Sequence, residues 1–253
     1  MKRISPYIIS LLVILFSSVS QVHAQDTIDV PLKIKVGLEV SGPAIYYSDK
    51  NILNAEAYIS ADMNEKRSFI FGTGYLNYKY SQYNYSYTNN GFFVRTGFDF
   101  NLLKPEKAQG KYWVGIGLHY GLSRFTSEIP SFQKDNYWGT VSSSISKKTN
   151  WGHFIEATPG VRVDVFKNIS IGWTISVRML LYTGTGKDLR PLYFPGFGYG
   201  AKTFSTGLNY FIVWNIQYKR IKVILKKEVP EEPVEPDETG KNGAVKQSTG
   251  IRQ

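Results

Sequence analysis

The sequence predicts an all-β protein: an eight-stranded antiparallel transmembrane β-barrel, built as an up-and-down meander and followed by a disordered C-terminal tail. Eight segments carry apolar residues at every second position, which is the period of a strand with one apolar face. These segments exceed the roughly five or six residues of soluble strands and reach the roughly 9–11 residues that a tilted membrane strand needs. Long and short connections alternate along the chain, as in outer-membrane barrels. A soluble barrel is the alternative, because its strands alternate in the same way.

The first four segments set apolar side chains against polar ones. In the first segment, Leu32, Val36 and Val40 share a face, and Lys35 and Glu39 lie on the other. The third segment is aromatic or aliphatic on both faces, so its facing is left open. The predicted strands are 32–42, 54–62, 67–80 and 91–102.

The last four segments continue the pattern. The fifth is the clearest, with Tyr112, Val114 and Ile116 on one face and glycines with His119 on the other. Pro159 lies inside the sixth segment and weakens that strand or marks a bulge there, because proline cannot donate to the ladder. The predicted strands are 112–123, 153–165, 168–182 and 204–219.

The connections predict which end of the barrel faces outward. Those expected outside the cell are long, and those expected in the periplasm are short. An even number of strands also returns the C-terminus to the periplasm. The extracellular connections are 43–53, 81–90, 124–152 and 183–203, and the periplasmic ones are 63–66, 103–110 and 166–168.

Residues 1–24 are typical of a secretory signal peptide. Lys2 and Arg3 precede an apolar run over 7–16, and Ala24 ends a small-residue cleavage motif before Gln25. The apolar run is shorter than the roughly 20 residues of a membrane helix, which disfavours an uncleaved anchor. We therefore expect export to the outer membrane of a Gram-negative bacterium. The predicted units are the signal peptide 1–24, the barrel 25–225 and an acidic, proline-rich periplasmic tail 226–253.

Composition excludes several classes of function. The chain has 253 residues, a formal net charge of +10 and no cysteine. Without cysteine there is no disulfide framework, no thiolate metal site and no lipoprotein anchor. No nucleic-acid recognition motif accompanies the positive charge, so we expect no nucleic-acid partner. For an exported chain, anionic lipid or lipopolysaccharide is the more natural partner.

The signal peptide, the Gln25 start, the eight alternating segments and the aromatic-ended last segment together resemble the small outer-membrane β-barrel proteins of Bacteroidota. Within that set the chain resembles an uncharacterised family of unknown function. The resemblance covers about residues 25–225 and brings no catalytic residues. The pattern Ser205-x-Gly207-x-x-Tyr210-x-Ile212 is similar to the signal read by barrel assembly machinery.

The inward face carries a set of charges. Buried charges must be paired, so the structural interpretation is a charge-paired plug that keeps the barrel rigid. A proton or ion path is the functional alternative. Lys33 and Lys35 would complete the pairing near the periplasmic rim. The predicted lumen charges are Glu39, Glu56, Arg95, Asp99, Glu156, Arg162, Asp164 and Arg178.

The outer connections carry exposed aromatic candidates for contact with a partner. Tyr83, Tyr85 and Tyr87 are spaced to share one face of an extended hairpin, either as a binding platform for sugars or protein or as a continuation of the aromatic girdle. Trp138 and Trp151 belong to the longest connection, whose aromatics and lysines either grip lipopolysaccharide or fold down over the barrel.

The sequence favours a non-enzymatic, monomeric protein with a structural or interaction role, without cofactor or metal. It would bind an envelope partner or lipopolysaccharide through its aromatic outer loops. The second hypothesis is an accessory subunit of an outer-membrane secretion or assembly complex, contacting it through the periplasmic tail and loops. The third is a lipid-modifying enzyme that uses His153, for which no nucleophile-base pattern is present.

Overall fold

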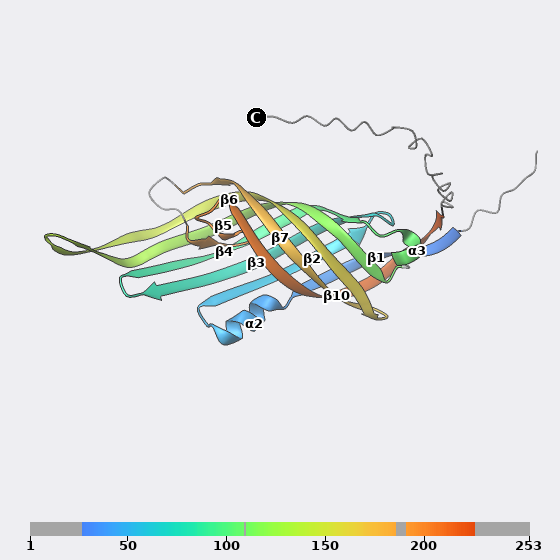
Figure 1. The fold of residues 1–253 in the computed structure, drawn as a ribbon, viewed down its shortest axis with the longest axis horizontal. Coiled ribbons are helices and arrows are strands. Elements are labelled where there is room, and N and C mark those ends of the chain that lie inside the picture. The colour runs from blue at the N-terminus through green and yellow to red at the C-terminus, as the bar shows by residue number, and fades with distance from the viewer. Residues whose placement is uncertain (1–26, 109, 186–190, 226–253) are drawn as a thin grey trace, which may run out of the picture.

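The computed structural model describes residues 27–108, 110–185 and 191–225. Eight long strands close into one antiparallel barrel in which successive barrel strands are neighbours and the last pairs with the first (Figure 1). The predicted signal peptide and tail, 1–24 and 226–253, lie outside the described residues. The barrel strands are β1 Thr27–Glu39, β2 Ile52–Asp62, β3 Arg67–Gln82, β4 Tyr85–Asn101, β5 Tyr112–Asn136, β6 Gly139–Phe166, β7 Ile169–Thr183 and β10 Phe204–Ile224.

The two ends of the barrel differ. At the terminal end, where β1 begins and β10 ends, the connections are short, and the longest of them holds helix α3, Pro105–Ala108. At the opposite end, called the hairpin end, the β3–β4 and β5–β6 hairpins extend the barrel, and the other two connections are long (Figure 1). They hold helix α2, Ser41–Ser48, and a small two-stranded sheet of β8, Tyr193–Phe194, and β9, Gly198–Tyr199. The predicted long connections are present only where α2 and the β8–β9 sheet lie; the other two connections at this end are two-residue turns, between Gln82 and Tyr85 and between Asn136 and Gly139.

Two predicted loops are in fact strand. The segment 124–152 is the far part of the β5–β6 hairpin, which stays paired as far as Asn136 opposite Gly139. Likewise, 81–90 belongs to the β3–β4 hairpin, which is paired as far as Gln82 opposite Tyr85. The two segments lack the apolar pattern for one reason: beyond the apolar belt the outward face of each hairpin turns polar, as at Thr88 and Glu128, although Tyr87 and Ile129 stay buried on the inward face.

Pro159 interrupts the ladder without a bulge. Between β6 and β7, pairing is present at Ala157 with Val177 and resumes at Gly160 with Thr174 in the same register. On the other side Pro159 still lies opposite Ile116 of β5. The strand therefore passes through the proline with a local loss of pairing, as expected for a residue that cannot donate.

An apolar belt covers the outside of the barrel. Large apolar side chains are exposed around it, from Leu38 on β1 and Ile59 on β2 to Ile171 on β7 and Trp214 on β10. On β3, Phe69 faces outward while its neighbours in the strand are buried, which settles the facing that the sequence left open. Such a belt is what a membrane barrel presents to lipid. No helix of the described residues is long and apolar enough to cross a membrane.

The interior is filled in layers. Nearest the terminal end, Tyr58, Ile70, Phe211 and Val213 form a buried apolar cluster. Towards the hairpin end, a second cluster joins Phe125 and Phe154 of the barrel to Phe194 and Phe197 of the segment between β7 and β10. The Phe194 ring stacks on Phe125 at 5.0 Å and on Phe197 at 4.9 Å between ring centroids. This segment, and not 124–152, folds down over the mouth.

Candidate functional site

Between the two apolar clusters lies a layer of buried ion pairs centred on Glu156 of β6. Arg178 Nε donates to one Glu156 oxygen at 2.7 Å, and Arg95 Nη1 donates to the other at 3.2 Å. Arg95 also pairs with Glu56 of β2. Four strands are thereby tied across the lumen, and each of the four side chains is under a tenth exposed. All four side chains are among the predicted lumen charges, and they pair with one another.

His119 of β5 is the residue of this layer that the charge count missed. Its Nδ1 lies 3.3 Å from Glu156 Oε2, and its Nε2 lies 3.0 Å from Asp99 Oδ1. Each ring nitrogen therefore faces a carboxylate, an arrangement in which the imidazolium form donates twice. Its position on the glycine-rich inward face was visible in the sequence, and that was the available signal.

A glycine makes room for the histidine. A Cβ on Gly117 would lie 2.6 Å from His119 Nε2 and 2.5 Å from Asp99 Oδ1, closer than real Cβ contacts. Any side chain at this position would have to displace the bridge between Asp99 and His119. The glycines on the inward face of β5 are therefore part of the site, because they leave space for buried polar groups.

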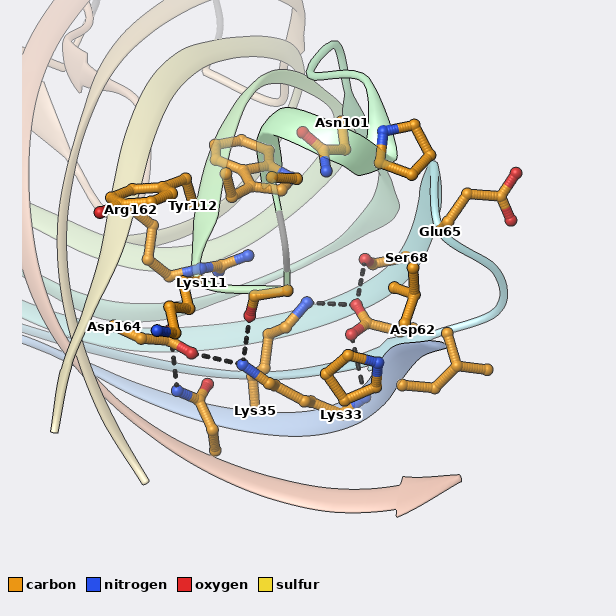
Figure 2. Close-up of a pocket in the computed structure, with 18 of the residues that line it drawn as sticks. Lys33, Lys35, Asp62, Glu65, Ser68, Asn101, Lys111, Tyr112, Arg162 and Asp164 are labelled. Atoms are coloured by element: carbon orange, nitrogen blue, oxygen red, sulfur yellow. Dashed lines mark hydrogen bonds and ion pairs between the residues drawn. The ribbon is translucent and has the colours of Figure 1, made fainter. Parts of the chain in front are cut away.

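A second set of pairs lies at the terminal mouth (Figure 2). Lys33 pairs with Asp164 and donates to the backbone oxygen of Gly110 at 2.7 Å. Lys35 pairs with Asp62, which also accepts from Ser68 Oγ at 2.6 Å. Both lysines thus pair with lumen carboxylates at this mouth. Asp62, at the end of β2, was missed although it continues the alternation of Glu56 and Ser60 on the predicted inward face.

Two predicted lumen charges find partners other than ion pairs. Arg162 lies over the Trp113 ring at 5.0 Å and donates to Tyr58 Oη at 3.4 Å. The carboxylate of Glu39 accepts from the backbone N–H groups of Ser41, at 2.7 Å, and Gly42, at 2.8 Å. Glu39 therefore anchors the first turn of α2, where a negative charge is favourable.

The lumen charges balance if His119 is protonated. The inward-facing acids of the described residues number six, and the lysines and arginines number five, so His119 supplies the sixth positive charge. The space beside His119 and Arg162 amounts to about 40 Å³, which is room for very little water. The acids are Glu39, Glu56, Asp62, Asp99, Glu156 and Asp164, and the bases are Lys33, Lys35, Arg95, Arg162 and Arg178.

The predicted tyrosine platform is divided by the structure. Tyr83 lies at the tip of the β3–β4 hairpin and is fully exposed. Tyr85 and Tyr87 share a face, stacked at 6.4 Å, but this face turns inward. Tyr87 is fully buried, and its hydroxyl donates to the backbone oxygen of Tyr193 at 3.3 Å. Tyr87 is therefore corrected from a contact candidate to part of the packing beneath the β8–β9 sheet.

The tryptophans of the longest hairpin are exposed. Trp138 lies at the tip and is 91% exposed, next to Tyr137 at 92%. Trp151 lies lower on the outward face, where the Arg124 guanidinium sits 5.6 Å from its ring. Of the two, Trp138 is the one placed to meet a partner away from the barrel.

His153 belongs to an outward-facing aromatic group. Its Nδ1 lies 2.5 Å from Tyr120 Oη, and its ring lies 6.1 Å from that of Tyr182. The serines of 142–146 are in the far part of the hairpin, where Ser143 pairs with Phe132, well above His153. In the described part of the chain, no group of three or more metal-ligating side chains comes together.

These features define a class of protein: an eight-stranded transmembrane barrel with a charge-paired lumen and one long hairpin. The chain belongs to the family described as a domain of unknown function, DUF6048, whose model matches residues 3–220. The expectation of an uncharacterised family is met, and the Bacteroidota origin stays a prediction. Among curated proteins no match is found.

Several solved structures are similar in fold to this chain. The attachment invasion locus protein Ail of Yersinia pestis is 12% identical, with 76% of this chain and 98% of Ail covered and a TM-score of 0.33. Neisserial surface protein A is 12% identical over 77% of this chain and all of its own, with a TM-score of 0.33. CarO of Acinetobacter baumannii is 10% identical over 75% and 98%, with a TM-score of 0.35.

Proposed function

We propose that this protein is a non-enzymatic barrel of the Gram-negative outer membrane that displays the β5–β6 hairpin outside the cell for binding. The hairpin end faces the medium, and the terminal end faces the periplasm. The predicted signal peptide, 1–24, supports export, and the short connections at the terminal end support this orientation.

The observation that carries the proposal is the composition of the exposed hairpin. Its tip carries Tyr137 and Trp138, both more than nine-tenths exposed. Below the tip lie three exposed lysines, Lys134, Lys147 and Lys148. Aromatic faces and cations suit phosphorylated sugars, so lipopolysaccharide or an acidic envelope protein is the fitting partner.

The rigid body of the barrel supports the same role. Loops on a fixed scaffold commonly carry binding, because the scaffold holds them in place without taking part. Here the ion pairs around Glu156 fix four strands, and the cluster of Phe194 and Phe197 closes the mouth below the hairpin.

The test compares binding of lipopolysaccharide by the full mature chain in detergent micelles with that of Trp138→Ala and of the triple variant K134A/K147A/K148A. We expect affinity to fall about tenfold or more in each, with salt dependence reduced in the triple variant. Tyr83→Ala, at the tip of the other hairpin, is the control of equal exposure. Unchanged affinity in both hairpin variants contradicts the proposal.

A further inference from the structure

The barrel wall is incomplete on one side. The pairing of β10 with β1 ends at Phe211 opposite Glu39, whereas its pairing with β7 continues to Phe204 opposite Met179. On the other side of β1, β2 pairs with it only as far as Ala57 opposite Leu38, whereas β2 continues on β3 to Ile52. Between 204–209 of β10 and 52–56 of β2 there is therefore no strand. The last backbone bond across is from Val40 N to Tyr210 O, at 2.9 Å.

Helix α2 covers this opening from the β2 side. It stands outside the ring of strands (Figure 1). Its first turn is held by the Glu39 carboxylate and lies so close to β2 that a Cβ on Gly42 would be 2.0 Å from the backbone oxygen of Asn54. The helix is thus seated against β2, and the remaining opening lies between α2 and β10.

The opening lies at the height of the apolar belt. Leu208 of β10 is opposite Ile175 of β7, and Thr206 is opposite Val177. Leu208, Ile175 and Val177 are 50%, 42% and 41% exposed on the outward face. On α2, Ile45 is exposed too, at 49%. The opening is therefore flanked by lipid-facing side chains.

Behind the opening is a cavity of about 620 Å³, a size typical of small-molecule sites. Its exposed lining includes the apolar residues Ile45, Phe204 and Leu208, here called the apolar rim, with Thr206 between the last two. Its floor is polar, and Lys202 adds a cation beside β10 that is exposed. The polar floor consists of Ser41, Asn54, Glu56, Arg178, Tyr193, Ser205 and Asn209.

The charged side chains of the floor are already paired with other residues. Arg178 pairs with Glu156, and Glu56 pairs with Arg95. Ser41 Oγ donates to Glu39, and Asn209 Nδ2 donates to Ser176 Oγ. The cavity therefore offers a ligand the remaining hydroxyl and amide groups plus the ammonium of Lys202. Such a set suits a headgroup with several hydroxyls and one phosphate, and the apolar rim suits the chains attached to it.

We propose that this cavity is a lateral binding site for the headgroup of a membrane lipid, which enters between α2 and β10 from the surrounding leaflet. The headgroup carries hydroxyls and a phosphate, and phosphatidylglycerol, which has both, serves as its probe. This lipid site rests on the proposed function only for the orientation of the barrel. With the hairpin end outside the cell, the lipid comes from the outer leaflet. An extended peptide is the other occupant that the unpaired edge of β10 would accept, but a lipid fits better, because it matches both the apolar rim and the polar floor.

The test places the full mature chain in phosphatidylcholine vesicles with a minor fraction of phosphatidylglycerol that bears a photoactivatable diazirine on its headgroup. After irradiation, the adducts are mapped by mass spectrometry. We expect adducts on inward-facing residues of the cavity, Asn54, Ser205 and Asn209. Free glycerol phosphate in the buffer should not compete, because the site is reached from the leaflet.

Ser205→Trp fills the floor and should lower the cavity adducts about tenfold, while adducts on the outward face near Ile155 persist. Gly207→Leu serves if Ser205→Trp does not fold, since a Cβ there meets only the Arg178 side chain, at 3.2 Å. Thr96→Trp, on the lipid face of β4, controls for an added tryptophan. Folding is checked by the gel shift on boiling.

The proposal is overturned if the wild type gives adducts only on outward faces, or if the filled variants keep the cavity adducts. Full competition by free glycerol phosphate would also overturn it, because the site would then open to water. So would capture of an extended peptide along 204–209 in place of lipid. No lipopolysaccharide is present, so failure here leaves the proposed role of the hairpin untouched.

Discussion

Replacing Glu156 by alanine should destabilise the barrel strongly. The Glu156 carboxylate accepts from Arg178 at 2.7 Å, Arg95 at 3.2 Å and His119 at 3.3 Å, and the residue is only 2% exposed. Three bonds to charged groups, at about 1.5–3 kcal/mol each, set an upper bound of roughly 5–9 kcal/mol. Arg95 keeps Glu56 and His119 keeps Asp99, so the main cost is one buried, unpaired Arg178. That cost is about 3–5 kcal/mol.

The assay is reversible urea unfolding of the mature protein in lipid vesicles, followed by tryptophan fluorescence. We expect Glu156→Ala to lower the free energy of unfolding by about 3–5 kcal/mol, and Glu156→Gln by less because the amide still accepts hydrogen bonds. Glu106→Ala, an exposed glutamate of α3, is the control and should stay within about 0.5 kcal/mol of wild type. A Glu156→Ala variant within about 1 kcal/mol of wild type would refute the role given to these ion pairs.

Three further changes have defined outcomes. Gly121→Ala should cost at least about 1–3 kcal/mol in the same assay, since its Cβ would lie 2.2 Å from the Phe154 ring, whereas Gly184→Ala, with 3.6 Å to its nearest neighbour, should be close to neutral. Phe197→Ala should loosen the cap, so that limited proteolysis cuts 183–203 faster while the gel shift on boiling persists; equal cutting rates would exclude the cap. Burial raises the pKa of Tyr193, so its contribution to stability is complete below about pH 10 and is lost as the pH rises above it. The difference in tyrosinate absorbance between wild type and Tyr193→Phe should therefore titrate above free tyrosine, and a midpoint at or below it would contradict the burial.

The membrane-spanning parts of the strands could be predicted because lipid imposes a period of two. Where lipid contacts the strand, as from Leu208 to Ile216 on β10, every second residue is apolar. Beyond the belt this constraint vanishes. The far part of β6, with Ser142, Ser144 and Lys147, is polar on both faces and so has the character of a loop.

The charge layer could be predicted in membership but not in pairing. Inward charges such as Arg95 and Glu156 follow from strand parity alone. Which carboxylate meets which guanidinium depends on the register between strands, which parity does not give. His119 was missed because only formal charges were counted, although the alternation of the strand clearly placed it on the inward face.

The cap and the lateral opening lay beyond any pattern in the sequence. The run from Pro191 to Gly200 has the glycine and proline content of a loop, and only the fold shows Phe194 and Phe197 buried in the mouth. The opening arises from where β1 stops relative to β10. Glu39 caps α2 at that point, a role that an inward-facing acid of β1 does not reveal.

The most direct test of the proposed topology uses the absence of cysteine from the chain. Trp138→Cys, at the tip of the β5–β6 hairpin, and Lys66→Cys, in the short turn between β2 and β3, are each labelled with a membrane-impermeant thiol reagent. In intact cells we predict labelling at 138 and none at 66, which should label only after the outer membrane is opened. Labelling at 66 in intact cells, or at neither site until the membrane is opened, would contradict an outer-membrane barrel that displays this hairpin outside.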